Sequence, residues 1–398
     1  MSQVQPQPQP PETGLPARVL YATSARIGGS GLSSVAYESL TGIHRAGILA
    51  QAIGYDNCQA TIPAQSVRTL RWHPVRLLSF LGSAHYYGAK RQYVDWVAAR
   101  ELVHGGYDFF HGWSGDALLT LREARRRGVP SLLEIPTWHR NKGVPKPWMT
   151  AGEKRALAAP LPRRWLDRLL VNRQRVLEEY DLASLLLVLS EKAIETFETA
   201  GIPRSRLFKL ERGVDVERFT PGPPPPCFRV VFVGALIRRK GVHRLLEAWR
   251  RLNLRDAELL LVGSVHEEIR PALAQWGGPD VRVAGFVSRP EELYRQASLH
   301  ILPSSCEGSA KTTYEAAACG LPQITTREAG DVVVHGENGL VIPADDTDAL
   351  ADAIRHLYDH PAQMAEMGAA GRRRVVEHYT WDHFRQRLLA AYRLARPR

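Results

Sequence analysis

Short apolar runs alternate with amphipathic stretches along most of the chain. Residues 18–23 form such a run, glycines follow it at positions 28, 29 and 31, and apolar residues from Leu32 to Leu40 then recur at helical spacing. This order predicts a strand, a glycine loop and a helix. Strands that alternate with helices predict a parallel sheet covered on both faces. The pattern continues with a strand at 107–111, a helix at 118–126, strands at 130–135 and 185–189, and a helix at 191–200.

A run of prolines at 221–226 interrupts the pattern, and consecutive prolines exclude helix and favour an extended connector. Because 398 residues exceed what one core usually supports, two domains are expected. The predicted fold class is therefore α/β, with doubly wound domains at 17–220 and 221–380 that face a central cleft. The last helical stretch, 381–398, is expected to return to the first domain. Further strands are expected at 229–233, 258–262, 281–285, 299–302 and 323–326.

The start of the chain and its cysteines indicate where the protein works. Residues 1–16 lack both a basic start and an apolar core, so they predict a disordered tail and not a signal peptide. No uninterrupted apolar run is long enough to cross a bilayer. The four cysteines lack the spacing of a zinc site or a disulfide framework. These features favour a cytoplasmic protein.

The charge of the chain is unevenly distributed. The formal net charge is +11, and most of the basic excess lies in the first 220 residues. An electropositive surface attracts phosphate-bearing partners, including anionic lipid headgroups. The aromatic and basic stretches at 68–100 and 163–168 are therefore candidates for peripheral contact with an anionic membrane. The alternative is that both are amphipathic helices packed on their own domain.

The segment at 303–322 carries the most informative chemistry. A strand is expected to end near Leu302, a loop follows, and an alanine-rich helix begins near Ala310. Ligands of parallel sheets bind beyond the carboxyl ends of strands, where the start of a helix presents N–H groups and partial positive charge to anions. Glu307 lies in the loop and Glu315 in the helix. Carboxylates accept hydrogen bonds from paired hydroxyls, as a ribose or a sugar requires.

These residues resemble a known signature. Glu307 and Glu315 are separated by seven residues and followed by AAACGLP at 316–322, which resembles glycosyltransferase family 4. Residues 213–219, 234–241 and 335–339 resemble further motifs of that family. The resemblance implies two Rossmann-like domains, the GT-B fold, and transfer of a sugar from a nucleotide-sugar to a hydroxyl acceptor with retention of configuration. It implies no cofactor and no obligatory metal. The acceptor is undefined, and both a saccharide and a lipid-linked hydroxyl suit it.

The resemblance also assigns roles to single residues. Lys240 is expected to neutralise the donor phosphate, Glu315 to bind the ribose and Glu307 to contact the transferred sugar. The family often has arginine where Ala235 stands, and Arg239 or Arg238 is expected to supply that charge. His111 resembles the active-site histidine and is expected to orient the donor sugar. The remaining donor contacts are expected from the glycine loop, from backbone groups and from one hydroxyl, at Gly28, Gly29, Ser309, Ala310, Lys311 and Thr312.

Other functions stay open at this point. A sugar-nucleotide epimerase of similar architecture would convert the donor without an acceptor. Because Ala235 replaces the arginine that the family often has, a protein that binds a nucleotide-sugar without catalysing transfer is a second alternative. The high pI near 9.7 suits a nucleic-acid-binding protein, but no recognisable module supports that, so no nucleic-acid partner is expected. Asp345, Asp346 and Asp348 precede a helix, and we expect them to cap it and not to bind a metal.

Overall fold

The computed structural model describes residues 14–29, 31–70, 74–80, 83–140 and 173–397. The chain forms two compact units. Unit 1 contains the described residues up to Val188, Ala193–Leu210 and the residues from Phe384 onward; unit 2 contains Leu189–Lys192 and Glu211–His383. The change from unit 1 to unit 2 after Leu210 thus precedes the proline run at 221–226.

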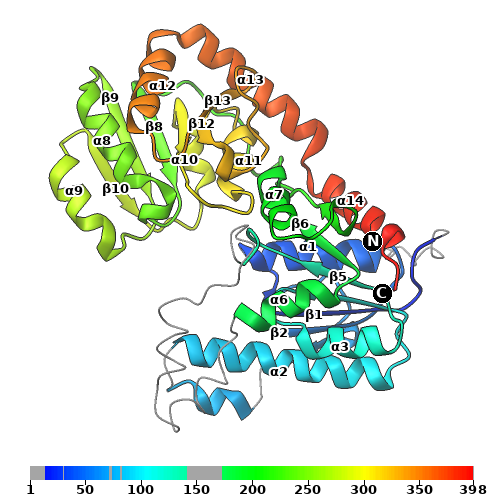
Figure 1. The fold of residues 1–398 in the computed structure, drawn as a ribbon. Coiled ribbons are helices and arrows are strands. Elements are labelled where there is room, and N and C mark those ends of the chain that lie inside the picture. Colours follow the sequence, from blue (N-terminus) through cyan, green and yellow to red (C-terminus); the bar gives the residue numbers. More distant parts are fainter. Residues whose placement is uncertain (1–13, 30, 71–73, 81–82, 141–172, 398) are drawn as a thin grey trace, which may run out of the picture. The chain divides into compact units, whose positions relative to one another are not determined.

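Unit 1 is built on a parallel sheet of seven strands in the order β3-β2-β1-β4-β5-β6-β7 (Figure 1). The order reverses direction beside β1, as in doubly wound folds. The strand predicted at 107–111 begins two residues later, at Phe109. Just before it, the Asp108 carboxylate accepts hydrogen bonds from the N–H groups of Ala17 and Arg18. The strands are β1 (Val19–Ile27), β2 (Leu49–Asn57), β3 (Val67–Thr69), β4 (Phe109–Trp113), β5 (Ser131–Glu134), β6 (Leu185–Val188) and β7 (Leu207–Lys209).

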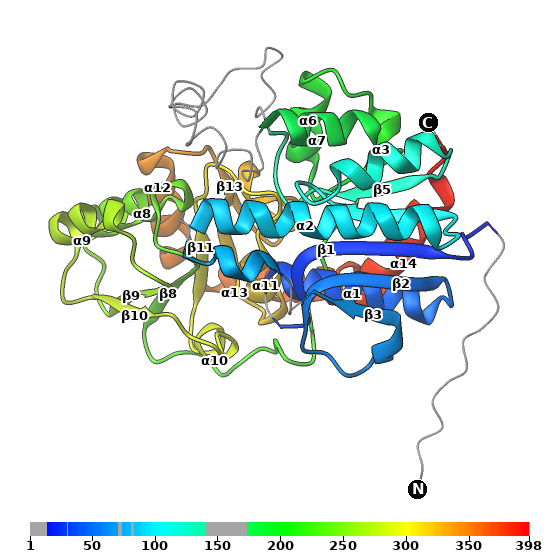
Figure 2. The ribbon, with the colours of Figure 1, turned by 90° about the horizontal axis from the view of Figure 1, so that it is seen from below.

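Helices cover both faces of this sheet. On one face α2 (Ser83–His104), α3 (Leu118–Arg126) and α6 (Arg173–Leu182) pack on alternate apolar residues of the strands; Figure 2 shows α2 lying along β1. On the other face lie α1 (Leu32–Arg45) and the end of α14 (Trp381–Leu394), joined by an ion pair between Arg385 and Glu38. The remaining described elements are α7 (Glu191–Thr199), η1 (Ala64–Ser66), η2 (Pro74–Leu78) and η3 (Arg204–Arg206).

Unit 2 repeats the design with six parallel strands in the order β10-β9-β8-β11-β12-β13. Alternate strand residues face two separate cores, one under α8, α9 and α12 and one under α10, α11 and α13. The strands are β8 (Phe228–Val233), β9 (Ala257–Val262), β10 (Val281–Gly285), β11 (Leu299–Leu302), β12 (Gln323–Thr326) and β13 (Gly339–Ile342). The helices are α8 (Val242–Leu252), α9 (Arg270–Trp276), α10 (Glu291–Arg295), α11 (Lys311–Ala318), α12 (Thr347–Asp359) and α13 (Pro361–His378), with η4 (Arg238–Lys240), η5 (Glu267–Ile269) and η6 (Arg327–Ala329).

Two predictions made from local pattern are confirmed. The fold class is α/β with two doubly wound parallel sheets. Asp346 is the N-cap of α12, and its carboxylate accepts the Ala349 N–H at 2.9 Å. The central cleft stays a prediction. The basic stretch at 163–168 lies outside the described residues, as do positions 71–73 and 81–82 of the stretch at 68–100.

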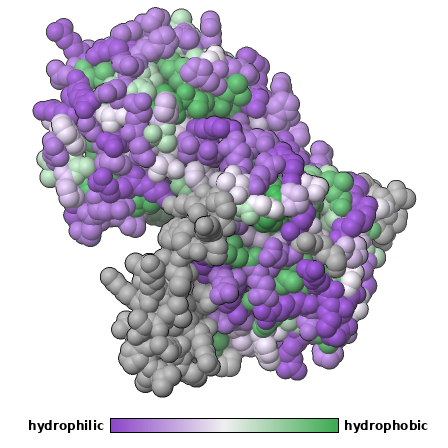
Figure 3. Space-filling view, viewed as in Figure 1, coloured by the Kyte–Doolittle hydropathy of each residue, from purple (hydrophilic) through white to green (hydrophobic). Residues whose placement is uncertain are grey.

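Polar side chains dominate the face of the molecule in Figure 3, and apolar side chains there gather in separate patches among them. Such patches are common on globular proteins. None of the helices in the described ranges combines the length and the apolar character that crossing a membrane requires.

Candidate active site

Three neighbouring strands of unit 2 end at glycines with positive φ. Gly234 follows β8 with φ 147°, Gly263 follows β9 with φ 146°, and Gly285 closes β10 with φ 69°. A Cβ on Gly263 would lie 1.9 Å from the Gly234 carbonyl oxygen, so no side chain fits there. A Cβ on Gly234 would lie 3.2 Å from the Lys240 side chain. The glycines let the backbone turn tightly at the carboxyl edge of the sheet, where ligands bind in such folds.

The turn η4 brings two cations to one carboxylate at this edge. The Lys240 Nζ lies 2.8 Å and the Arg239 Nη1 3.0 Å from Oε1 of Glu307. Lys240 and Glu307 are largely buried, whereas the Arg239 side chain is 46% exposed. The N–H of Glu307 donates to the Glu328 carbonyl at 3.0 Å, which anchors the loop. The structure therefore brings together Arg239, Lys240 and Glu307, which the sequence assigned separately.

The first turn of α11 lies next to Glu307 in sequence and has no side-chain cap. Within the described residues no oxygen accepts from the N–H groups of Lys311 and Thr312. The Thr312 hydroxyl is buried and also lacks a hydrogen-bond partner there. Unpaired N–H groups at a helix start carry partial positive charge, so this turn is suited to an anionic or oxygen-rich ligand.

Two neighbouring positions already have protein partners. The N–H of Ala310 donates to the Ala329 carbonyl at 2.8 Å. The Ser309 hydroxyl pairs with the Tyr314 hydroxyl at 2.9 Å, and both side chains are buried. These bonds hold the loop in place before α11. The ligand contacts that the resemblance implies for Ser309 and Ala310 stay predictions.

Glu315 is held inside unit 2 by two partners. Its side chain is 2% exposed, its Oε1 lies 2.6 Å from the Lys311 Nζ, and its Oε2 accepts from the Tyr294 hydroxyl at 3.2 Å. Burial raises the pKa of Tyr294 well above its ordinary value, so this hydroxyl stays protonated and donates. A carboxylate has about four acceptor positions, so Glu315 retains capacity for two adjacent hydroxyls.

In unit 1 the glycine loop after β1 has two different constraints. Gly28 and Gly29 have φ values of 88° and 105°. A Cβ on Gly28 would lie 3.2 Å from the Cys58 Sγ and 3.3 Å from the Gln59 backbone nitrogen, whereas one on Gly29 would meet only Ser33 at 3.8 Å. Gly28 is therefore required by packing as well as by φ. Approach of this loop to donor phosphates stays a prediction.

His111 lies in a fully enclosed position between the sheet and α14. Its exposure is 0%, because it points to the same face of β4 as Phe109 and packs beside Tyr392. Its Nδ1 is 2.7 Å from the Tyr392 hydroxyl and its Nε2 is 3.1 Å from Oε1 of Glu134. This is the geometry of a structural histidine. It offers no exposed ring nitrogen for the hydrogen bond to a donor sugar that the resemblance implies.

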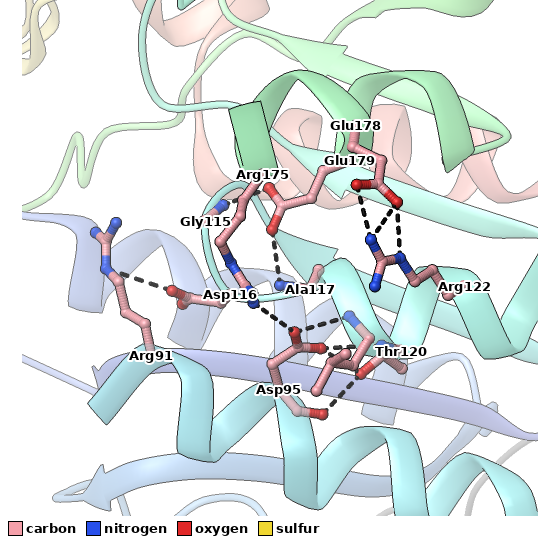
Figure 4. A network of polar contacts seen from close by, with 11 residues as sticks. Arg91, Asp95, Gly115, Asp116, Ala117, Thr120, Arg122, Arg175, Glu178 and Glu179 are labelled. Atoms are coloured by element: carbon pink, nitrogen blue, oxygen red, sulfur yellow. Dashed lines mark hydrogen bonds and ion pairs between the residues drawn. The ribbon is translucent and has the colours of Figure 1, made fainter. Parts of the chain in front are cut away.

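Carboxylates from two other helices cap the start of α3, just after β4 (Figure 4). Glu179 of α6 accepts from the N–H groups of Gly115 and Ala117 at 2.6 and 3.1 Å. Asp95 of α2 accepts from two N–H groups in the first turn of α3 at 2.8 and 2.9 Å. Burial raises the pKa of Glu179 to about 8 and that of Asp95 to about 6. Protein carboxylates thus satisfy this helix start, in contrast to α11.

Comparison with known proteins defines the class. The family model described as glycosyl transferases group 1 matches residues 227–360, which include η4, the Glu307 loop and α11. The chain belongs to this family, as its motifs predicted. It is therefore a glycosyltransferase that takes its sugar from a nucleotide-sugar donor, and the epimerase and binding-protein alternatives are not favoured.

One curated relative supports the same assignment, and two solved structures share the fold. The D-inositol 3-phosphate glycosyltransferase of Pseudarthrobacter chlorophenolicus is 31% identical over 297 residues, which cover 68% of this chain and 67% of the relative. Sucrose-phosphate synthase from Thermosynechococcus elongatus has a similar fold, with a TM-score of 0.67, 19% identity, and coverage of 94% of this chain and 98% of that one. The Anabaena protein HepE, solved in complex with UDP and glucose, gives a TM-score of 0.64, 16% identity, and coverage of 94% and 99%.

Several of the residues described above escaped the sequence analysis. Tyr294 lies outside every motif and reaches Glu315 only because α10 and α11 pack on the same face. Asp95 and Glu179 look like ordinary helix residues in the sequence. Glu134 carried a usable signal, because an acidic residue that ends an apolar strand needs a buried partner.

Proposed function

We propose that the protein transfers a hexose from a nucleotide-sugar to a hydroxyl acceptor with retention of configuration and without a bound metal ion. The observation that carries this proposal is the position of Arg239 and Lys240 around Glu307, directly before the uncapped start of α11. Two cations and the N–H groups of a helix start would then bind one diphosphate, and the carboxylate beside them would accept hydrogen bonds from the attached sugar.

The charge around Glu307 explains how the leaving group is stabilised. Cleavage of the sugar–phosphate bond leaves negative charge on the nucleoside diphosphate. The Lys240 ammonium and the N–H groups of Lys311 and Thr312 are prearranged to receive that charge, the task that a divalent cation performs in other enzymes. The Glu307 carboxylate, now paired with Lys240, would accept hydrogen bonds from hydroxyls of the transferred sugar. The departing phosphate would take the proton of the acceptor hydroxyl.

Glu315 is proposed to hold the ribose. Its two oxygens are oriented by Lys311 and Tyr294, so the carboxylate does not need to reorganise when hydroxyls arrive. The partner atoms come from a helix and its neighbour in unit 2, which are rigid elements. His111 is proposed to act indirectly, by holding β4 and Tyr392 together, and not by touching the sugar.

Unit 1 is proposed to bind the acceptor and to approach an anionic membrane as a peripheral cytoplasmic protein. Leu77 and Phe80 support membrane contact because their side chains are 78% and 80% exposed in a basic region near the start of α2. Replacing both by serine should reduce co-sedimentation with anionic vesicles and leave nucleotide-sugar binding unchanged. Equal sedimentation of the two proteins would refute the contact.

The central test measures donor binding. Thermal shift with a panel of nucleotide-sugars should raise the melting temperature of the wild type with at least one donor, because a ligand that binds only the native state stabilises it. Glu315→Gln should weaken that donor about 10-fold or more, the usual effect of losing a hydrogen bond to a charged group. Glu366→Gln, on the exposed face of α13, is the matched control and should bind like the wild type. No shift with any donor would contradict the proposal.

Two further measurements test the mechanism. Proton NMR of the first product should show the anomeric configuration of the donor, and an inverted product would disprove retention. Turnover should be unchanged by EDTA. If EDTA abolished turnover and added Mg²⁺ restored it, Arg239 and Lys240 would not be sufficient to stabilise the leaving diphosphate.

A further inference from the structure

A second set of cations lies in unit 1, apart from the donor residues. Arg26 and Asp56 stand opposite each other at the carboxyl ends of β1 and β2. The helix α2 precedes β4, which is parallel to β1, so its first turns lie at the same carboxyl edge. A hydrogen bond of 2.7 Å between the hydroxyls of Tyr55 and Tyr86 joins β2 to α2 there. Lys90 lies one turn further along α2.

Lys90 has aromatic neighbours but no carboxylate partner in the part of the chain that the structure describes. Its Nζ lies 3.3 Å from the centre of the Tyr55 ring and 5.9 Å from that of Tyr87. Within the described residues no carboxylate forms an ion pair with it. Its side chain is half-buried, and burial lowers the pKa of Lys90 to about 8. The ammonium group has thus lost part of its hydration without gaining a direct ion pair with a described carboxylate, so an arriving anion would stabilise it.

The nearest carboxylates are already engaged by arginines. Arg26 pairs with Asp56 at 3.1 Å, and Arg91 lies 3.4 Å from Asp116 (Figure 4). Asp116 also accepts the Ser24 N–H at 2.8 Å. Asp56 and Asp116 influence the charge of Lys90, as do Arg26 and Arg91, which places all five groups in one electrostatic neighbourhood. Three cations therefore face two carboxylates, and the cluster retains positive charge.

The start of α3 near these cations is satisfied by the protein. It would attract an anion, but Asp95 and Glu179 occupy its N–H groups. An anion that approaches this part of the carboxyl edge therefore finds complementary charge at Lys90 and not at α3. The two arginine side chains are 59% and 43% exposed, so they remain accessible to a ligand.

We infer that Arg26, Lys90 and Arg91 form a subsite for a phosphate ester carried by the acceptor. Guanidinium groups match two phosphate oxygens at once, and an ammonium group adds a point charge. The assignment of this phosphate to the acceptor rests on the proposed function, whereas the binding of phosphate to these three cations does not. Both a soluble phosphomonoester and a lipid phosphodiester present this chemistry.

The test observes Lys90 directly. Reductive methylation with ¹³C-formaldehyde keeps each lysine positively charged and gives it one NMR signal, and Lys90→Arg identifies the signal of Lys90. Titration with inorganic phosphate should shift this signal saturably and raise the pKa of Lys90. Sodium chloride at matched ionic strength should not. An unmoved Lys90 signal, or an equal response to chloride, would overturn the inference.

Variants separate a built subsite from general attraction. Arg91→Gln and Arg26→Gln should each weaken phosphate binding about 10-fold, the usual effect of losing one charge-assisted contact. Arg26 is the safer variant, because its side chain is more exposed than that of Arg91. Arg125→Gln removes the same charge from the exposed last turn of α3 and should have no effect. Equal weakening by Arg26→Gln and Arg125→Gln would overturn the inference.

The same spectra distinguish this inference from the proposed function. UDP-glucose or GDP-mannose should shift the signals of Lys240 and Lys311; if neither donor does so while phosphate shifts Lys90, the proposed donor site fails and the subsite stands. Vesicles with and without phosphatidylinositol identify the source of the phosphate. If the wild type is retained on phosphatidylinositol vesicles and Lys90→Gln abolishes this retention, the acceptor is a lipid. If Lys90→Gln leaves the retention unchanged while inorganic phosphate still shifts the Lys90 signal of the wild type, the acceptor is a soluble phosphomonoester.

Discussion

Glu179 should make the stability of unit 1 depend on pH in an unusual direction. Glu179 is 1% exposed, and its carboxyl group accepts hydrogen bonds from two N–H groups at the start of α3. Burial raises its pKa from 4.5 to about 8, and the nearby carboxylates of Asp95 and Asp116 act in the same direction. At a pH between these two pKa values, Glu179 carries a proton in the folded protein that it has released in the unfolded chain.

The sign and size of the effect follow from proton linkage. Because the native state binds more protons than the unfolded state in this window, the free energy of unfolding falls as pH rises, and the contribution disappears above about pH 8. One pKa unit corresponds to about 1.4 kcal/mol. Raising the pH from about 5.5 to about 7.5 should therefore lower the free energy of unfolding by about 2–3 kcal/mol through Glu179 alone.

Denaturant unfolding at several pH values, followed by tryptophan fluorescence, measures this slope. Glu179→Gln removes the titratable group and leaves one of the two N–H groups facing an amide NH2. It should therefore be less stable than the wild type at low pH and should lose the Glu179 part of the slope. Glu178→Gln is the matched control on the same helix, because Glu178 is 39% exposed and pairs with Arg122 at the surface. Identical slopes for Glu179→Gln and the wild type would refute a raised pKa at Glu179.

Two further predictions concern backbone geometry and the buried histidine. Gly263→Ala should destabilise unit 2 by at least about 2 kcal/mol and weaken donor binding, because its Cβ would displace the Gly234 carbonyl under Lys240. Gly336→Ala, which has positive φ but no neighbour within 4 Å, measures the φ strain alone, and an equal cost in both variants would contradict the contact. Tyr392→Phe should cost about 1–3 kcal/mol of stability by leaving the Nδ1 of His111 unpaired, without changing kcat of the folded protein. A lower kcat at unchanged stability would instead support a catalytic role for His111.

The order of strands and helices could be predicted from sequence because each element is a local pattern. Apolar runs bounded by glycine and proline marked most strands, and the capping role of Asp346 followed from its place before α12. The positions of Glu307 and Glu315, the two residues proposed to bind the donor, were predictable for a related reason. Glu307 and Glu315 lie on one short loop and the helix after it, so their spacing in the chain sets their spacing in the fold.

The residues of unit 1 show what local pattern leaves open. The sequence placed His111 at the end of a strand, where the same sequence is compatible with an exposed or with a buried imidazole ring. Its surroundings depend on α14, whose Tyr392 is 281 positions away and reaches β4 only through tertiary packing. The caps at the start of α3 likewise come from Asp95 and Glu179 on two other helices.

The sequence by itself determined the α/β class, the glycosyltransferase family and the loop that carries Glu307 and Glu315. Only the tertiary structure decided that Lys240 and Arg239 meet Glu307, that Tyr294 orients Glu315, and that Lys90 pairs with no carboxylate among the described residues. The physical reason is the range of the interactions. Hydrogen bonding and periodicity along one element act over a few residues, whereas burial and ion pairing depend on which distant segments the core brings together.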